Sequence, residues 1–90
     1  MQVLQKPTFQ RVYKKLHANS RLEVDSAIRE IMENPLVGDA KVGDLAGVRV
    51  YKFRMINQLT LLAYTYEEEV VTLTLLALGS HENFYRNLKN

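Results

Sequence analysis

The spacing of apolar residues changes once along this chain, near Gly47, and this change constrains the fold more than any other feature. Before Gly47, one apolar stripe repeats at i, i+3, i+4 and i+7, which is typical of a helix. Its members are Phe9, Val12, Tyr13 and Leu16. After Gly47, the apolar runs are rich in β-branched, aromatic and leucine residues, which is typical of strands. The sequence therefore predicts helices first and a sheet second.

Local signals divide the first half. Residues Gln2 to Gln5 form a short predicted strand, and Pro7 suits the first turn of a helix, where its missing N–H costs little. Ser20 begins a Ser-x-x-Glu capping box and predicts the start of a second helix. Asn34-Pro35 ends that helix, because the residue before proline avoids the α region. Two helices joined by a short polar link form an antiparallel hairpin.

The second half contains three predicted strands, 48–55, 59–66 and 70–78, with turns at 56–58 and 67–69. The last strand is apolar at nearly every residue, so we expect it to be central and covered on both faces. The Gly-rich segment 36–47 is predicted to be a loop, and 80–90 a short helix. The fold class is α+β: an N-terminal helical hairpin packed on a mostly antiparallel sheet of three or four strands, with one sheet face partly open.

Length and composition narrow the class of protein. A chain of 90 residues makes a single domain, residues 1–90. It contains no cysteine, and its two histidines are far apart, so neither a disulfide nor a metal site is expected. No apolar run approaches the roughly 20 residues of a membrane span, and no signal-peptide core is present. We expect a cytoplasmic protein with no cofactor, no membrane contact and no small-molecule ligand.

Positive charge is segregated along the sequence, although the net charge is only +2. The first twenty residues contain cations and no acid, namely Lys6, Arg11, Lys14 and Lys15. A second group, Arg49, Lys52 and Arg54, lies in a stretch without acids between Asp44 and Glu67. This pattern indicates a basic face for a polyanion such as RNA. Ordinary solvated surface charge explains the pattern equally well when charge is considered alone.

Several motifs resemble the RelE/ParE toxin superfamily, and the resemblance covers essentially the whole chain. The order of elements is the same, and Gly79-Ser80-His81 followed by an aromatic residue resembles the YafQ-like and related branches. The segment 45–54 resembles the family's second strand, which often bears basic residues, and 62–64 resembles the close of its third strand. Many members carry an arginine where this chain has Leu61, and RelE has an arginine where this chain has His81.

The resemblance implies a toxin of a type II toxin–antitoxin system. The family's RNase members cleave mRNA in the ribosomal A site without a metal, whereas the ParE branch poisons DNA gyrase and lacks the RNase residues. Both are silenced by an antitoxin. The implied partners are therefore a cognate antitoxin, the ribosome and mRNA. The resemblance also leaves open an inactive homologue that binds only its antitoxin.

Four residues are the candidates for catalysis. His81 titrates near pH ~6.5 when unperturbed, so it is the predicted general acid or base, unless it is a capping histidine. Lys52 and Arg54 are two residues apart and project from one side of a strand, where they address one phosphate or form a solvated edge pair. Tyr85 is predicted to stack on a base or to bind the phosphate, although either Phe84 or Tyr85 is expected in the core.

The remaining candidates are predicted to bind RNA or the ribosome. Lys6, Arg11, Lys14 and Lys15 would contact rRNA phosphates, an interaction that weakens as salt rises. Arg49 points away from Lys52 and Arg54 if the strand is regular, which makes it the weaker candidate. Asn83 either hydrogen-bonds RNA or satisfies the start of the last helix. The sequence thus predicts an mRNA endonuclease, with a ParE-type gyrase inhibitor as the alternative.

Overall fold

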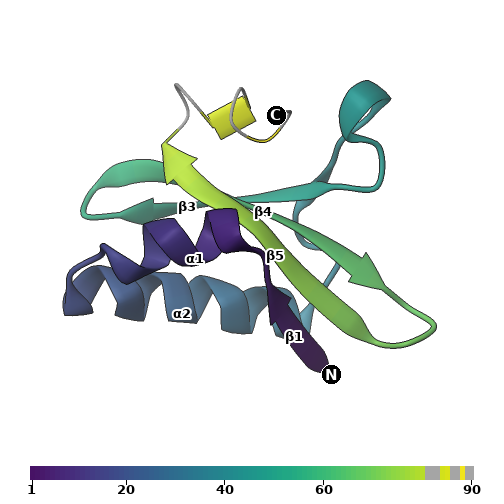
Figure 1. Cartoon of the computed structure of the whole chain (residues 1–90), viewed down its shortest axis with the longest axis horizontal. Coiled ribbons are helices and arrows are strands. Elements are labelled where there is room, and N and C mark those ends of the chain that lie inside the picture. The colour runs from purple at the N-terminus through teal and green to yellow at the C-terminus, as the bar shows by residue number, and fades with distance from the viewer. Residues whose placement is uncertain (81–83, 86–87, 89–90) are drawn as a thin grey trace.

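The computed structural model describes residues 1–80, 84, 85 and 88 and confirms the α+β class. Figure 1 shows α1 and α2 on one side of the sheet and the short yellow helical segment of residues 84–85 on the other. The elements are β1 (Gln2–Gln5), α1 (Pro7–Lys14), α2 (Ala18–Glu33), β2 (Asp39–Ala40), the 3₁₀ helix η1 (Gly43–Leu45), β3 (Arg49–Met55), β4 (Gln58–Glu67) and β5 (Thr72–Ser80). Among the described residues, no helix is long and apolar enough to cross a bilayer.

The sheet has five strands in the order β1-β5-β4-β3-β2. β1 is parallel to β5, and the other neighbouring pairs are antiparallel. The expected count of three or four strands was too low, because β2 pairs only Asp39 and Ala40 and lies inside the segment predicted to be a loop. A tight turn at Ile56 and Asn57, both with positive φ, joins β3 to β4 as expected.

The middle strand is β4, so the prediction that the last strand is central was wrong. In β4 the residues from Thr60 to Tyr64 are all buried, which shows cover on both faces. β5 also lies inside the sheet, but Thr72, Thr74 and Leu76 are only half-buried. β5 contains a bulge at Leu76, which has no partner on β4. Apolar residues of β5 therefore fall on both faces of the sheet although neither face of the strand is fully covered, and this misled the prediction.

The predicted start of α2 was also wrong. The helix begins at Ala18 with His17 as its N-cap residue, and no side chain caps it. Ser20 is therefore inside the first turn, where it is buried. The carboxylate of Glu23 accepts a hydrogen bond from the N–H of Ile56 at 3.1 Å instead of closing a capping box. The predicted end was correct, because Asn34 is the C-cap residue.

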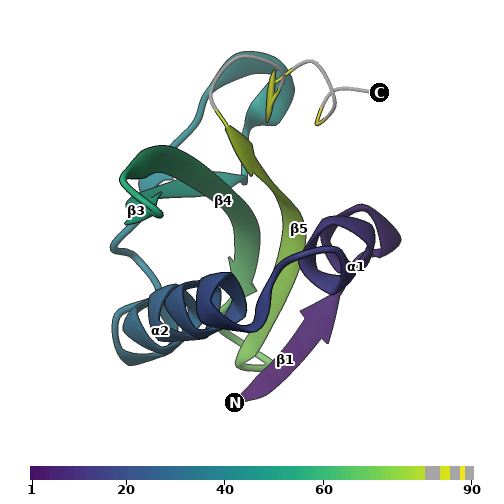
Figure 2. The same ribbon diagram turned by 90° about the vertical axis from the view of Figure 1, so that its left-hand side faces the viewer.

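The sheet buries apolar side chains on both faces. The inner face packs on α1, which lies against β5, and on α2, which lies against β3 (Figure 2). Its core comprises Phe9, Val24, Ala27, Ile31, Leu62, Tyr64, Leu73, Leu75 and Leu78. The outer face has a smaller core of Val50, Leu61, Ala63, Ala77 and Phe84. The face that was expected to be partly open is thus covered in part by Phe84, with Tyr85 and Leu88 packed against the same core.

Candidate functional site

Lys52 and Arg54 lie side by side on the outer face of β3, as the spacing predicted. Their neighbour Val50 belongs to the outer core, and strand alternation places all three on one side. Both cationic side chains are exposed. Their Cα atoms are two strand residues apart, which is roughly 6.6 Å. This separation suits two cations that address one phosphate group.

Within the described part of the chain, neither cation is held firmly. The ammonium of Lys52 lies 4.0 Å from Oδ2 of Asp39, and the two side chains are 49% and 65% exposed, so the pair contributes little to stability. Arg54 donates one hydrogen bond, of 3.2 Å, to the carbonyl of Asn57. Its side chain also borders a groove of about 280 Å³ beside α2, because β3 is open along that edge. Both cations can therefore turn toward an anionic ligand at small cost.

Arg49 plays a different part from Lys52 and Arg54. Its guanidinium donates to the carbonyls of Leu36 at 3.1 Å and Gly38 at 2.8 Å. The hydroxyl of Tyr64 lies in the same region, where it accepts from the N–H of Gly38 and donates to the carbonyl of Pro35. Arg49 and Tyr64 together stabilise the segment 35–38, which joins α2 to β2, through hydrogen bonds to its backbone. The guanidinium of Arg49 is therefore committed to backbone carbonyls.

The aromatic pair after β5 divides between core and surface. Phe84 is 3% exposed and packs in the outer core, whereas Tyr85 is half-buried. The two rings meet edge to face, with centroids 5.3 Å apart and an interplanar angle of 89°. Leu61 is fully buried in the same core. The expectation that one of the two aromatics is core is confirmed for Phe84.

The strand register brings the end of β5 near Lys52. Lys52 pairs with Leu61 on β4, and Leu61 pairs with Gly79 on β5. Two strand spacings separate Lys52 from Gly79, which is roughly 10 Å. The predicted His81 follows two residues later in the sequence, but His81 and Asn83 lie outside the described residues. Their roles stay predictions.

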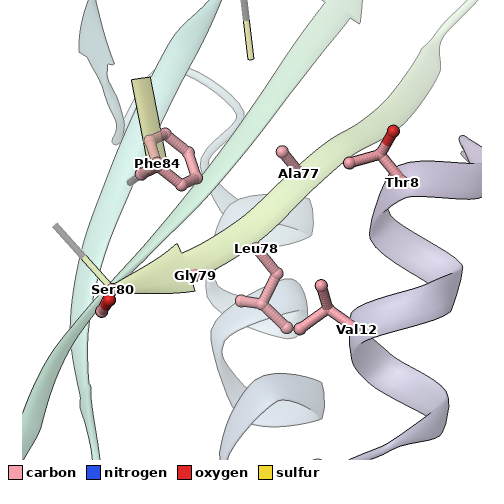
Figure 3. A pocket seen from close by; sticks show the side chains of 7 residues that line it. All are labelled: Thr8, Val12, Ala77, Leu78, Gly79, Ser80 and Phe84. Atoms are coloured by element: carbon pink, nitrogen blue, oxygen red, sulfur yellow. The ribbon is translucent and has the colours of Figure 1, made fainter. Parts of the chain in front are cut away.

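A small apolar cavity borders this end of β5. Its volume is about 260 Å³, and it lies between α1 and Phe84 (Figure 3). The lining residues are Thr8, Val12, Ala77, Leu78, Gly79, Ser80 and Phe84. Hydroxyl groups of Thr8 and Ser80 supply the polar atoms among the side chains. The cavity lies beside the end of β5 rather than over the two cations.

Lys41 is a residue of the outer face that the sequence analysis missed. Its N–H donates to the carbonyl of Val48 at 2.9 Å, which continues the pairing of β2 with β3. Its ammonium lies 5.5 Å from the centroid of the Tyr85 ring. The charge of Lys41 therefore joins those of Lys52 and Arg54 on this face. The sequence contained one signal for this strand: between Gly38 and Gly43, the charged residues Asp39 and Lys41 alternate with apolar residues.

Arg11, Lys14 and Lys15 form a second basic surface at the end of α1. Lys6, Arg11, Lys14 and Lys15 are all exposed. The last three lie in or just after the last turn of α1, where positive charge also complements the helix dipole. Arg21 of α2 extends this surface, because it donates to the carbonyl of Lys14 at 2.9 Å and lies over the ring of Tyr13. The predicted binding residues on α1 are therefore accessible together.

Lys6 stands apart from the other three at the start of α1. It lines a groove of about 610 Å³ at the β1 end of the outer face. The other lining residues are Leu4, Gln5, Thr65, Glu67, Thr74 and Leu76. One cation and one anion border this groove. Across residues 1–80, 84, 85 and 88, histidine, aspartate and glutamate form no group of three that would hold a metal ion.

A family model described as the ParE-like toxin of type II bacterial toxin-antitoxin systems matches residues 3–89. The chain belongs to this family of toxins. No curated protein sequence matches the chain. The RelE/ParE resemblance is thus confirmed at the level of the superfamily, whereas the YafQ-like branch and the C-terminal motif stay predictions.

Solved structures from three bacteria show the same fold as this ParE-like toxin. A chain of the intact Escherichia coli RelBE toxin-antitoxin complex has 18% identity and a TM-score of 0.72, over 90% of this chain and 96% of that one. The YoeB/ParE toxin from Agrobacterium tumefaciens has 17% identity and a TM-score of 0.72, over 90% and 99%. A chain of the Mycobacterium tuberculosis RelBE2 complex has 21% identity and a TM-score of 0.61, over 89% and 96%.

Proposed function

We propose that this toxin is a ribosome-dependent mRNA endonuclease that needs no metal and that cuts RNA at the outer face of its sheet. The observation that carries the proposal is the pair Lys52 and Arg54, which are exposed on one side of β3 and make weak contacts with the described residues. Two lightly held cations at this spacing suit the negative charge of a reacting phosphate. Lys41 and Tyr85 border the same surface.

The proposed chemistry uses the RNA's own 2′-hydroxyl. The 2′-oxygen attacks the adjacent phosphorus, a base takes the 2′-proton, and the bond to the 5′-oxygen breaks as an acid protonates that oxygen. The products are a 2′,3′-cyclic phosphate and a free 5′-hydroxyl. His81 is the proposed acid or base, and such help is worth about 10²–10⁴-fold. Lys52 and Arg54 would stabilise the extra charge on the phosphorane, and Tyr85 would stack on a base.

The basic surface of α1 is the proposed contact with the ribosome. Lys14 and Lys15 lie three and four residues after Arg11, so both neighbour Arg11 on one side of the helix and its end. Lys6 lies at the start of the same helix. Phosphate contacts by these side chains position the protein without selecting a sequence. Arg49 is left out of this proposal because its guanidinium binds carbonyl groups, and Asn83 would bind the RNA.

An antitoxin is the proposed protein partner. The matching family consists of toxins of type II systems, and one solved relative is the E. coli toxin RelE in complex with an antitoxin RelBc peptide. A small basic domain with a partly open sheet suits an acidic chain that folds on binding. We expect such a partner to suppress the toxicity of this chain when both are expressed together.

Gyrase inhibition is the second candidate function, and two observations favour it. The matching family model is ParE-like, and Leu61 is buried where many RNase relatives carry an arginine. A buried leucine supplies no charge to a phosphate, so an endonuclease of this type would depend more on Lys52 and Arg54. A ParE-type toxin would instead inhibit by binding and would need no acid–base residue.

Induced expression in bacteria separates the two functions. Wild type, His81→Ala and Lys52→Ala/Arg54→Ala are compared with Arg29→Ala, which removes an exposed cation from α2. We expect wild type and Arg29→Ala to arrest growth and to produce new mRNA 5′ ends inside translated codons, and the other two variants to do neither. Growth arrest without mRNA cuts, together with lost DNA supercoiling, would instead establish gyrase as the target.

A further inference from the structure

Residues 39–41 form a short arm along the edge of β3. Asp39 pairs with Val50 and Ala40 with Arg49, and the N–H of Lys41 donates to the carbonyl of Val48 at 2.9 Å. Residues paired across an antiparallel ladder point to the same face, so Asp39 lies on the outer face with Val50. Lys41, two residues later, faces the same way. Both charged side chains of the arm therefore face the candidate site.

Each charged side chain of the arm meets one residue of that site. Oδ2 of Asp39 lies 4.0 Å from the ammonium of Lys52. The ammonium of Lys41 lies 5.5 Å from the centroid of the Tyr85 ring, within the range of a cation–π interaction. Lys41 is half-buried, whereas Lys52 is exposed, so water screens the contact of Lys41 less.

Tyr85 is held on a second side by its neighbour. Its ring meets the ring of Phe84 edge to face at 5.3 Å, and Phe84 is buried in the outer core. A side chain between a buried ring and the ammonium of a half-buried lysine has few orientations left. We propose that Lys41 is a positioning residue that fixes the Tyr85 ring for contact with RNA. This inference rests on the proposed endonuclease function and names a further residue of that site.

A direct phosphate contact is the competing role for Lys41. A lysine that binds a phosphate contributes about one unit to the slope of log affinity against log salt. Removal of a lysine that acts through Tyr85 leaves this slope unchanged and lowers kcat instead. The ammonium of Lys41 lies over the Tyr85 ring, and the ring face already provides this cation with an attractive partner. This position favours the role through Tyr85 over a direct phosphate contact.

The test is a set of variants assayed for mRNA cleavage on programmed ribosomes. Lys41→Met keeps the apolar stem and removes the charge, and we expect kcat to fall about 3- to 30-fold. Lys41→Arg should retain most of the activity, because guanidinium also binds aromatic faces. Arg29→Met, which removes an exposed cation of α2, is the matched control and should cleave at the wild-type rate.

Coupling between the two residues decides the inference. If Lys41 acts through Tyr85, Tyr85→Leu should lose as much activity alone as together with Lys41→Met. Losses that multiply instead, or a Lys41→Arg variant as weak as Lys41→Met, would overturn the positioning role. A salt slope reduced by one unit in Lys41→Met would also overturn it and assign Lys41 to a phosphate.

An independent measurement separates this inference from the proposed function. In the free toxin, NMR should show the ε-methylene protons of Lys41 shifted by the ring current of Tyr85, and Tyr85→Leu should abolish that shift. The expected ring-current shift in a wild-type protein that cleaves no mRNA would overturn the endonuclease function, and the positioning role with it. Cleavage by a wild type that shows no shift would overturn the positioning role alone.

Discussion

The two faces of one sheet are built from different side chains. The inner face packs large residues such as Phe9, Ile31 and Tyr64 against two helices, and each of these is at most 1% exposed. The outer face has a smaller core, in which Phe84 lies with Val50, Leu61, Ala63 and Ala77. The exposed cations of β3 also stand on this outer face. The inner face therefore supplies most of the hydrophobic stabilisation, and the outer face presents groups that can bind a ligand.

Deleting a large inner side chain should have the largest effect. Phe9→Ala should lower the free energy of unfolding by about 3–5 kcal/mol, because it removes a buried ring and leaves a cavity. Phe84→Ala should cost less, since it leaves the inner core intact. Chemical denaturation of both variants measures the difference. Equal losses would contradict the view that the inner face dominates stability.

Removing the outer cations should affect activity rather than stability. Lys52→Ala and Arg54→Ala should each lower mRNA cleavage about 10²–10³-fold, the cost of losing one electrostatic donor. The free energy of unfolding should change by less than about 0.5 kcal/mol, because both side chains are exposed. Cleavage rates and denaturation curves of the same preparations test this. A stability loss comparable to that of Phe9→Ala would assign these residues to the scaffold.

The sequence predicted those parts of the two faces that follow a regular period. The stripe of α1 and the shared side of Lys52 and Arg54 follow from periods of 3.6 and 2. β2 was missed because a strand of two residues has no measurable period. The contact of Lys41 with Tyr85 joins residues far apart in sequence and depends on the folded sheet. The start of α2 was misplaced because tertiary packing buries Ser20.

The segment between α2 and β2 leads from the inner face of the sheet to its edge, and it should tolerate little added volume at Gly38. A Cβ atom at Gly38 would lie 2.8 Å from both Cε1 and the hydroxyl oxygen of Tyr64. Gly38→Ala should therefore cost about 1–3 kcal/mol through overpacking and a weakened N–H bond to that hydroxyl. Val37→Ala, at an exposed neighbouring position, is the control. A Gly38→Ala protein as stable as wild type would show that Tyr64 can move aside.

The smallest expected effect is a loss of stability at alkaline pH that comes from the inner face and the helices. Burial raises the pKa of Tyr64 above its ordinary value near 10.0, and a hydrogen bond to Asp25 raises the pKa of Tyr13. The unfolded chain then loses these protons at lower pH than the folded chain does. The stabilisation is complete below about pH 10 and declines as pH rises through the folded pKa values.

Urea unfolding between pH 8 and pH 11 measures this decline. Wild type should lose stability more steeply above pH 10 than Tyr64→Phe, which lacks the buried hydroxyl. Tyr13→Phe/Tyr64→Phe should have the shallowest slope of the three. Tyr64→Phe also leaves the Gly38 N–H and the Pro35 carbonyl without this partner, so its stability at pH 8 should be lower by about 1–3 kcal/mol. Parallel curves above pH 10 would mean that the hydroxyl of Tyr64 ionises equally readily in the folded and unfolded chains.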